Sequence, residues 1–451
     1  MISLKNDSIG KLLWDFSMPA IVGMLVNALY NIISRIFVGR GVGSIAIAAV
    51  TVALPVMTLM MAVTMLIGVG ATALISIRMG EKKMDEVEKI AGNATALLVV
   101  LPFLLSLVYF LFADPILMLF GSSPEVLPYA KEYVNVIMLG AIPGAIAFGV
   151  NNFIRAEGNP RFAMETQIIG AVINIICNYV YIFIFNWGIA GSAWAAVTGQ
   201  TISAIWVLSY FLLGRSKIKL KISNFKIVMP IVLKTLTIGF APFAMQIANT
   251  IQQTILNQTL SRHGGDIALS AVGILMSVNM LLLMPIVGVS QGAQPIIGYN
   301  YGARNYDRVK EALKKAIIAG TAMATFGYIL LLLFAVPVVE LFSKGDTALT
   351  DLTVHALLTF MAVMPVVGFQ IIGSSYFQAV GKPIQSTFLS LSRQVLFFIP
   401  LLLILPRYIG IEGVWITAPI ADVLAILVTG TLLFYEIKKQ RKLALATDIQ
   451  S

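Results

Sequence analysis

The chain has 451 residues, of which 58% are hydrophobic and only 12% are charged, whereas about a quarter are charged in an ordinary soluble domain. This composition excludes a disordered, collagen-like or disulfide-built protein and argues against a water-soluble enzyme. The single cysteine, Cys177, excludes an internal disulfide and a multi-cysteine metal site. A net charge of +10 would suit a nucleic-acid-binding protein, but the positions of the charges favour a membrane.

Long apolar runs recur along the whole chain, and a bilayer-spanning helix takes about 20 such residues. We therefore predict an all-α integral membrane protein with twelve transmembrane helices. The predicted spans are Leu12–Val38, Ile47–Ile75, Ile90–Ala113, Tyr133–Ile154, Phe162–Phe185, Ile189–Leu213, Ile231–Leu260, Leu269–Ile297, Ala316–Val339, Leu352–Ala379, Ile384–Pro406 and Gly413–Tyr435. The first span is too long for a cleavable signal peptide and lacks a small-residue cleavage site, so we expect it to remain in the mature protein.

Lysine and arginine predict the orientation of these spans. Most of the 31 basic residues lie in the N-terminus, the even-numbered connections and the C-terminus, including a cluster from Arg215 to Lys234 after the sixth span. The positive-inside bias then places both termini in the cytoplasm of a multi-pass protein of the plasma membrane. The basic excess faces anionic membrane lipid, and nucleic acid is not needed to explain it.

The two halves of the chain repeat each other at an offset of about 222 residues. The matching segments are Gly70-Ala71 with Gly292-Ala293, Asp85-Glu86-Val87 with Asp307-Arg308-Val309, Ala156-Glu157-Gly158-Asn159-Pro160 with Ala379-Val380-Gly381-Lys382-Pro383, and Pro19 with Pro242. Each half has an even number of spans, so the two are parallel repeats with substrate expected between or within them near the midplane. We predict an N-terminal lobe (1–214), a basic cytoplasmic linker (215–229), a C-terminal lobe (230–437) and a cytoplasmic tail (438–451).

Two of the apolar spans carry polar stripes. The stripes consist of Asn27, Tyr30, Asn31 and Ser34 in the first span and of Gln246, Asn249, Thr250, Gln253 and Asn257 in the seventh. Unpaired amides are costly in hydrocarbon, so the stripes should face protein or water. They either line a central substrate cavity or form interhelical hydrogen bonds. The recurrence in both halves favours the lining.

Three further groups of residues are candidates for ion coupling or movement. Asp422 is the one carboxylate well inside a span, and Arg393 lies at a similar depth, so the two either sense a coupling cation or form a structural ion pair. Asn174, Asn178 and Tyr181 in the fifth span either ligate a cation weakly or form a hydrogen-bond cluster. Pro19 and Pro242 each remove one backbone hydrogen bond from a span, which produces a hinge or a static kink.

Motifs for enzymatic chemistry are missing or misplaced. No G-x-x-x-x-G-K-[ST] sequence provides an ATP site, and the G-x-S-x-G match at Gly288–Gly292 falls in an apolar helix rather than at a strand-to-helix turn. Two separated histidines and one cysteine argue against a zinc site. We expect no enzyme activity, no metal and no cofactor beyond the coupling ion.

The sequence resembles the multidrug and toxic compound extrusion (MATE) family, in particular its DinF-like and prokaryotic drug-exporter branches. The resemblance covers nearly the whole chain and rests on segments such as Phe16-Ser17-Met18-Pro19, Leu29-Tyr30-Asn31-Ile32, Asn152–Pro160, Gln291-Gly292-Ala293-Gln294-Pro295 and Phe377-Gln378-Ala379. It implies two six-helix lobes that form a V around a cleft. It also implies export of organic cations or other amphiphiles, driven by inward flow of H⁺ or Na⁺.

The sequence departs from this family at the N-terminal cation site. Many relatives carry Asp at the positions of Ser34 and Asn178, and those carboxylates form the cation site that the resemblance implies. Because both charges are missing here, that site is absent, weakened or replaced in the C-terminal lobe, and we assign coupling to Asp422, whose repeat partner is Gln200.

The leading hypothesis is therefore a monomeric polyspecific efflux antiporter for drug-like molecules. A flippase for lipid-linked precursors is the alternative within transport, and it would need a strongly basic cleft, for which Arg35 and Arg393 are the only candidate cations within the spans. An intramembrane enzyme is the rival from another class. It would need a second carboxylate or a histidine at matching depth.

Overall fold

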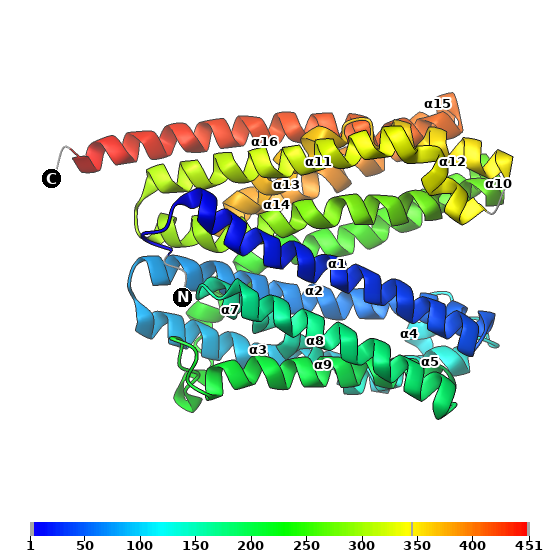
Figure 1. Cartoon of the computed structure of the whole chain (residues 1–451), viewed down its shortest axis with the longest axis horizontal. Helices are drawn as coiled ribbons and strands as arrows, with labels where there is room; N and C mark the ends of the chain where they lie inside the picture. Colours follow the sequence, from blue (N-terminus) through cyan, green and yellow to red (C-terminus); the bar gives the residue numbers. More distant parts are fainter. Residues whose placement is uncertain (1–3, 344–345, 449–451) are drawn as a thin grey trace. The chain divides into compact units, whose positions relative to one another are not determined.

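A computed structural model describes residues 4–343 and 346–448 (Figure 1). These residues form helices and contain no β-strand. Ten helices are long and apolar enough to cross a membrane, and two bent helix pairs raise the number to 12 when each pair is counted as one span. The predicted all-α membrane protein is confirmed.

The first half of the chain contains the six predicted spans and one short helix that was not predicted. Its elements are α1 (Ile9–Gly41), α2 (Ser44–Gly80), α3 (Met84–Leu111), the short α4 (Ala113–Leu119), α5 (Leu127–Leu139), α6 (Ala141–Gly149), α7 (Asn151–Ala156), α8 (Pro160–Tyr179), the π-helix η1 (Val180–Ile184) and α9 (Gly188–Leu212). A 3₁₀-helix, η2 (Ile222–Phe225), lies within the predicted linker.

The second half repeats this order. Its elements are α10 (Met229–Gly302), α11 (Tyr306–Ser343), α12 (Thr347–Phe360), α13 (Met364–Ala379), α14 (Pro383–Leu391), the π-helix η3 (Ser392–Phe398), α15 (Ile399–Ile409) and α16 (Ile411–Asp448). The element α10 comprises two spans, Met229–Gly265 and Ile267–Gly302, which meet at a non-helical Gly265. Residues 438–448 of the predicted tail continue α16, whereas residues 449–451 lie outside the described residues.

The fourth span of each half is bent rather than straight. The N-terminal span bends by 54° between Leu127–Leu139 and Ala141–Ala156, and the C-terminal one bends by 50° between Thr347–Phe360 and Met364–Ala379. The sequence predicted one uninterrupted span in each place. The nearly equal angles at equivalent positions show that the duplication preserved the bend.

The repeated Gly-x-Pro segments explain how the fourth and fifth spans of each half connect. Gly158 and Gly381 both have a positive φ, of 102° and 71°, which glycine adopts without the steric cost of a side chain. Pro160 and Pro383 then begin α8 and α14, where the missing N–H costs nothing. In the first half Asn159 caps α8 by accepting a hydrogen bond from the amide of Phe162 at 3.3 Å.

The chain divides into two compact units whose boundaries fall inside helices α1 and α10. Unit 1 consists mainly of Val22–Phe243, and unit 2 contains Lys5–Ile21 together with the chain from Ala244 onward. The predicted lobes differ from these units, because residues 5–21 group with the second half and residues 230–243 group with the first. Pro19 and Pro242 lie within three residues of the two boundaries.

The predicted basic linker is attached to unit 1 by buried polar side chains. The Asn93 side chain donates to the carbonyls of Asn224 and Lys226, both at 3.1 Å, and accepts from the amide of Val228 at 2.7 Å. Lys221 forms an ion pair with Glu88 at 2.7 Å. Because these contacts hold both ends of η2, residues 221–228 are a folded part of unit 1.

A second contact fixes the start of the linker. The Glu157 carboxylate accepts hydrogen bonds from the Ser216 hydroxyl at 2.7 Å and from the Lys217 backbone amide. Ile218, directly after them, is fully buried in the core of unit 1. Burial raises the pKa of Glu157, and the hydrogen bonds from Ser216 and from the backbone of Lys217 and Ile218 oppose that increase.

Candidate functional site

In unit 1, Ser34 from α1 and two asparagines from α8 form a neutral polar cluster. The Ser34 hydroxyl donates to Asn174 Oδ1 at 2.9 Å, and Asn178 Nδ2 donates to the same oxygen at 2.9 Å. Asn178 is fully buried, and its Oδ1 has no hydrogen-bond partner among the described residues. The three side chains that the sequence singled out in different spans are thus brought together, without a carboxylate among them.

Tyr181 lies one turn beyond this cluster, within the π-helix η1. Its hydroxyl is 3.5 Å from the Thr198 hydroxyl of α9, and its ring stacks on Trp187 with centroids 4.9 Å apart. A π-helix widens one turn and shifts the following side chains around the helix axis. Tyr181 is therefore held by aromatic stacking and α9, and no hydrogen bond joins it to Asn174 or Asn178.

The polar stripe of α1 remains accessible. Asn27 and Asn31 are both exposed, and Asn31 Nδ2 donates to the backbone carbonyl of Asn27 at 2.8 Å and to its Oδ1 at 3.1 Å. Tyr30 is half-buried. An accessible pair of amides can exchange its mutual hydrogen bonds for bonds to a polar ligand, so the stripe is suited to a lining role, which stays a prediction.

The equivalent stripe of α10 has the same construction. Gln253 Nε2 donates to Asn257 Oδ1 at 2.9 Å, and Asn249 Nδ2 lies 3.4 Å from Gln246 Oε1. The Thr250 hydroxyl donates to the carbonyl of Gln246 at 3.2 Å, so it is satisfied by its own helix. Both stripes thus pair amides one turn apart along a single helix.

An ion pair in unit 2 joins η3 to α16. Arg393 Nε donates to Asp422 Oδ1. The Asp422 side chain is only 7% exposed, whereas the Arg393 side chain is 25% exposed. The depths of the two residues in antiparallel spans predicted that their side chains could reach each other, and the structure brings them together. The role of the pair in sensing a cation stays a prediction.

Gln394, which the sequence analysis missed, extends this site toward α10. Its Nε2 donates to Asn249 Oδ1, while its Oε1 is buried without a partner among the described residues. The π-helix η3 contains both Arg393 and Gln394, so these consecutive residues contact α16 and α10 respectively. The signal that could have identified Gln394 is a second polar side chain beside Arg393 in an apolar run.

These contacts divide the candidate site into a neutral cluster in unit 1 and a charged one in unit 2. Amide and hydroxyl oxygens bind a cation weakly, whereas a carboxylate contributes a full charge. Within the part of the chain that the structure describes, no group of three or more His, Cys, Asp or Glu residues could hold a metal ion. Asp422 contributes the carboxylate of the charged cluster, and its role in binding a coupling ion stays a prediction. The hinge roles of Pro19 and Pro242 stay predictions.

Comparison with known proteins agrees with this architecture. The family model MatE matches the chain twice, over residues 19–180 and 242–404, which are offset like the internal repeat. The chain is 26% identical over 417 residues to "Multidrug export protein MepA" of Staphylococcus aureus (strain N315), and this alignment covers 92% of both chains.

Solved structures show the same fold. The "Crystal structure of MATE in complex with MaL6" matches with a TM-score of 0.93 at 24% identity, covering 97% of this chain and 98% of the other. The "Outward-facing conformation of a multidrug resistance MATE family transporter of the MOP superfamily" matches with a TM-score of 0.92 at 24% identity and the same coverage. Because the family model covers both halves and most of the sequence, the chain belongs to the MatE family of multi-pass membrane proteins.

Proposed function

We propose that this protein exports drug-like organic cations or other amphiphilic compounds across the plasma membrane by antiport with H⁺ or Na⁺. The family assignment over both halves carries the proposal, and the relative "Multidrug export protein MepA" supports it. In this proposal the protein is a monomer with both termini in the cytoplasm, and its two lobes alternate access to the substrate.

The pair Arg393–Asp422 suggests how coupling works. The pair is neutral as a unit, and its carboxylate is almost fully buried. When H⁺ or Na⁺ binds Asp422, the Arg393 guanidinium loses its counter-charge in a poorly solvated region, where an unpaired charge is unfavourable. An organic cation nearby would then be repelled. The coupling ion and the substrate would thus weaken each other's binding, as reciprocal linkage requires.

The adjacent amides provide a route from this pair to the substrate. Gln394 follows Arg393 in η3 and donates to Asn249 of the α10 stripe. A movement of η3 that separates Arg393 from Asp422 would also displace Gln394 and free Asn249. The flippase alternative would need a strongly basic cleft, and Arg393, one of the two candidate cations for it, is paired with Asp422 in this structure.

The test is uptake of ethidium into proteoliposomes under separately imposed pH and Na⁺ gradients. We expect one of the two gradients to drive uptake by the natural protein and Asp422→Asn to reduce it to the level of protein-free liposomes. Asp351→Asn is the matched control, because Asp351 is an exposed carboxylate of α12 in the same unit. Normal gradient-driven uptake by Asp422→Asn would refute the coupling role, and the absence of uptake under either gradient would refute antiport of this cation.

A further inference from the structure

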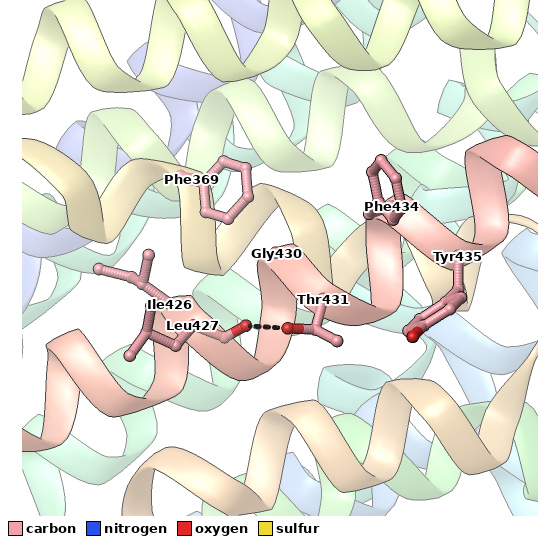
Figure 2. A pocket seen from close by; sticks show the side chains of 7 residues that line it. All are labelled: Phe369, Ile426, Leu427, Gly430, Thr431, Phe434 and Tyr435. Carbon is pink, nitrogen blue, oxygen red and sulfur yellow. Dashed lines mark hydrogen bonds between the residues drawn. The ribbon is translucent and has the colours of Figure 1, made fainter.

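A groove on unit 2 lies apart from the polar clusters. It has a volume of about 490 Å³ and is formed by α16 and by Phe369 of α13. This volume is within the range of ligand sites, about 300–1,000 Å³. Figure 2 shows Gly430 between the rings of Phe369 and Phe434, with Leu427 and Tyr435 on the same helix.

The groove is apolar throughout its length. The Thr431 hydroxyl, its one side-chain hydroxyl besides that of Tyr435, donates to the carbonyl of Leu427 at 2.8 Å (Figure 2). Leu427 and Phe434 are more than 60% exposed. No carboxylate or amide side chain lines it, so the groove is suited to a hydrocarbon chain and lacks groups that would orient a polar drug.

The open space depends on Gly430. A Cβ atom at this position would have only Phe369 ring atoms as neighbours, at 3.8 and 3.9 Å. These are ordinary van der Waals distances, so a larger side chain would enter the groove without a clash at its first atom. Gly430 therefore keeps the groove open.

The length of the groove matches one leaflet of a bilayer. Ile426 and Tyr435 lie nine residues apart on α16, which corresponds to roughly 14 Å of helix. Half of the hydrocarbon core is about 15 Å thick. Tyr435 lies close to the end of the membrane-spanning part of α16 at Lys439, where tyrosine typically lies at the level of the lipid headgroups.

Positive charges follow the groove at the end marked by Tyr435. Lys438 and Lys439 lie one helical turn beyond Phe434 and Tyr435, so they continue the same faces of α16. Both lysines are exposed, and neither pairs with another of the residues that the structure describes. The carboxylate between the groove and these lysines, Glu436, is buried and paired with Lys382.

We infer that this groove binds one anionic phospholipid, with an acyl chain between Phe369 and Phe434 and the phosphate at Lys438 and Lys439. The apolar groove is as long as one leaflet is thick, so it matches an acyl chain. The two exposed lysines at its end match the phosphate group. With both termini in the cytoplasm, as in the proposed topology, the lipid comes from the inner leaflet.

Native mass spectrometry of the purified full-length protein tests this inference with phosphatidylglycerol and phosphatidylcholine as probes. We expect the natural protein to retain phosphatidylglycerol preferentially and the double variant Lys438→Gln/Lys439→Gln to lose that preference. Gly430→Leu should reduce retention of both lipids. Gly273→Leu is the matched control, because a Cβ at Gly273 on α10 of the same unit also meets open space.

Equal lipid retention by the natural protein and Gly430→Leu would overturn the inference. It would also be overturned if Gly430→Leu weakened binding of tetraphenylphosphonium and left lipid retention unchanged, which would assign the groove to a substrate. The readout needs no transport, so its failure is distinguishable from failure of the proposed antiport. Size-exclusion profiles of the variants confirm that each is folded.

Discussion

The ion pair between Arg393 and Asp422 can be tested by a double-mutant cycle. Asp422→Leu leaves the Arg393 guanidinium without its partner in a site where only 25% of its side chain is exposed. Removing one member of a buried pair typically costs 3–5 kcal/mol, and the partial exposure of Arg393 favours the lower end, about 3 kcal/mol. For a domain of roughly 200 residues this loss lowers the melting temperature by about 6–12 °C.

The double variant Arg393→Met/Asp422→Leu should behave differently. Replacing both charges by apolar side chains of similar size removes the cost of desolvation together with the attraction, so stability should return to within about 1 kcal/mol of the natural protein. The assay is the fraction of protein that remains monodisperse after heating in detergent. Asp351→Leu, at an exposed carboxylate of the same unit, should change stability by less than about 0.5 kcal/mol.

The outcome distinguishes a coupled pair from two independent side chains. If the double variant is as unstable as Asp422→Leu, or less stable, the two charges do not compensate each other and the structural argument is wrong. If the cycle behaves as expected, the stable double variant also removes folding as a cause of lost transport. Its ethidium uptake should then remain at background although the protein is intact.

Three further predictions concern unit 1. Ser34→Asp adds a carboxylate beside Asn174 and Asn178, so ethidium transport in proteoliposomes should acquire an altered pH or Na⁺ dependence. Asn93→Ala removes three hydrogen bonds to the linker, each contributing about 1 kcal/mol, so hydrogen exchange of residues 224–228 should accelerate. Because the pKa of Glu157 is raised by burial, its stabilising contribution is present at low pH and is lost as pH rises through the folded-state pKa. The protection of the amides of residues 216–218 against hydrogen exchange, corrected for the intrinsic pH dependence of exchange, should therefore fall with rising pH. Glu157→Gln should remove that dependence.

Each of these predictions has a contrary outcome. Unchanged pH and Na⁺ dependence in Ser34→Asp would show that the neutral cluster is not a former cation site. Thr95→Ala is the control for Asn93→Ala, because among the described residues the Thr95 hydroxyl bonds to the carbonyl of Ala91 in its own helix and to no part of the linker. Equal exchange in the two variants would refute the attachment of the linker. A pH profile that persists in Glu157→Gln would assign the titration to another group.

Several features of the fold were predictable from local properties of the chain. Apolar runs of sufficient length predicted all twelve spans, because a helix in lipid must satisfy its backbone hydrogen bonds internally and present apolar side chains. The repeat was visible because its turn motif needs glycine at a positive φ and proline at a helix start, as at Gly158 and Pro160. Both requirements act within a few residues, so they can be read without knowledge of the tertiary contacts.

The partners of the polar groups could be predicted only where spacing and depth limited the choices. The meeting of Arg393 with Asp422 followed from their depths in two antiparallel spans. Gln394 was missed because its partner, Asn249, is 145 residues away and because a π-helix, which hydropathy does not reveal, changes the direction of side chains in this span. The bends in the fourth and tenth spans also escaped prediction, because the two helices of each bent pair together meet the hydropathy criterion for one span.

The contacts of the linker (215–229) could not be predicted from its own residues. Its charges marked it as a cytoplasmic connection, yet Asn93 and Glu157, residues of other elements, attach it to unit 1. Hydropathy describes each segment in relation to lipid and water, and it suffices to locate the spans because that environment is the same for every span. Hydrogen bonds and ion pairs depend on which distant segments meet, and this is defined only when the helices have packed.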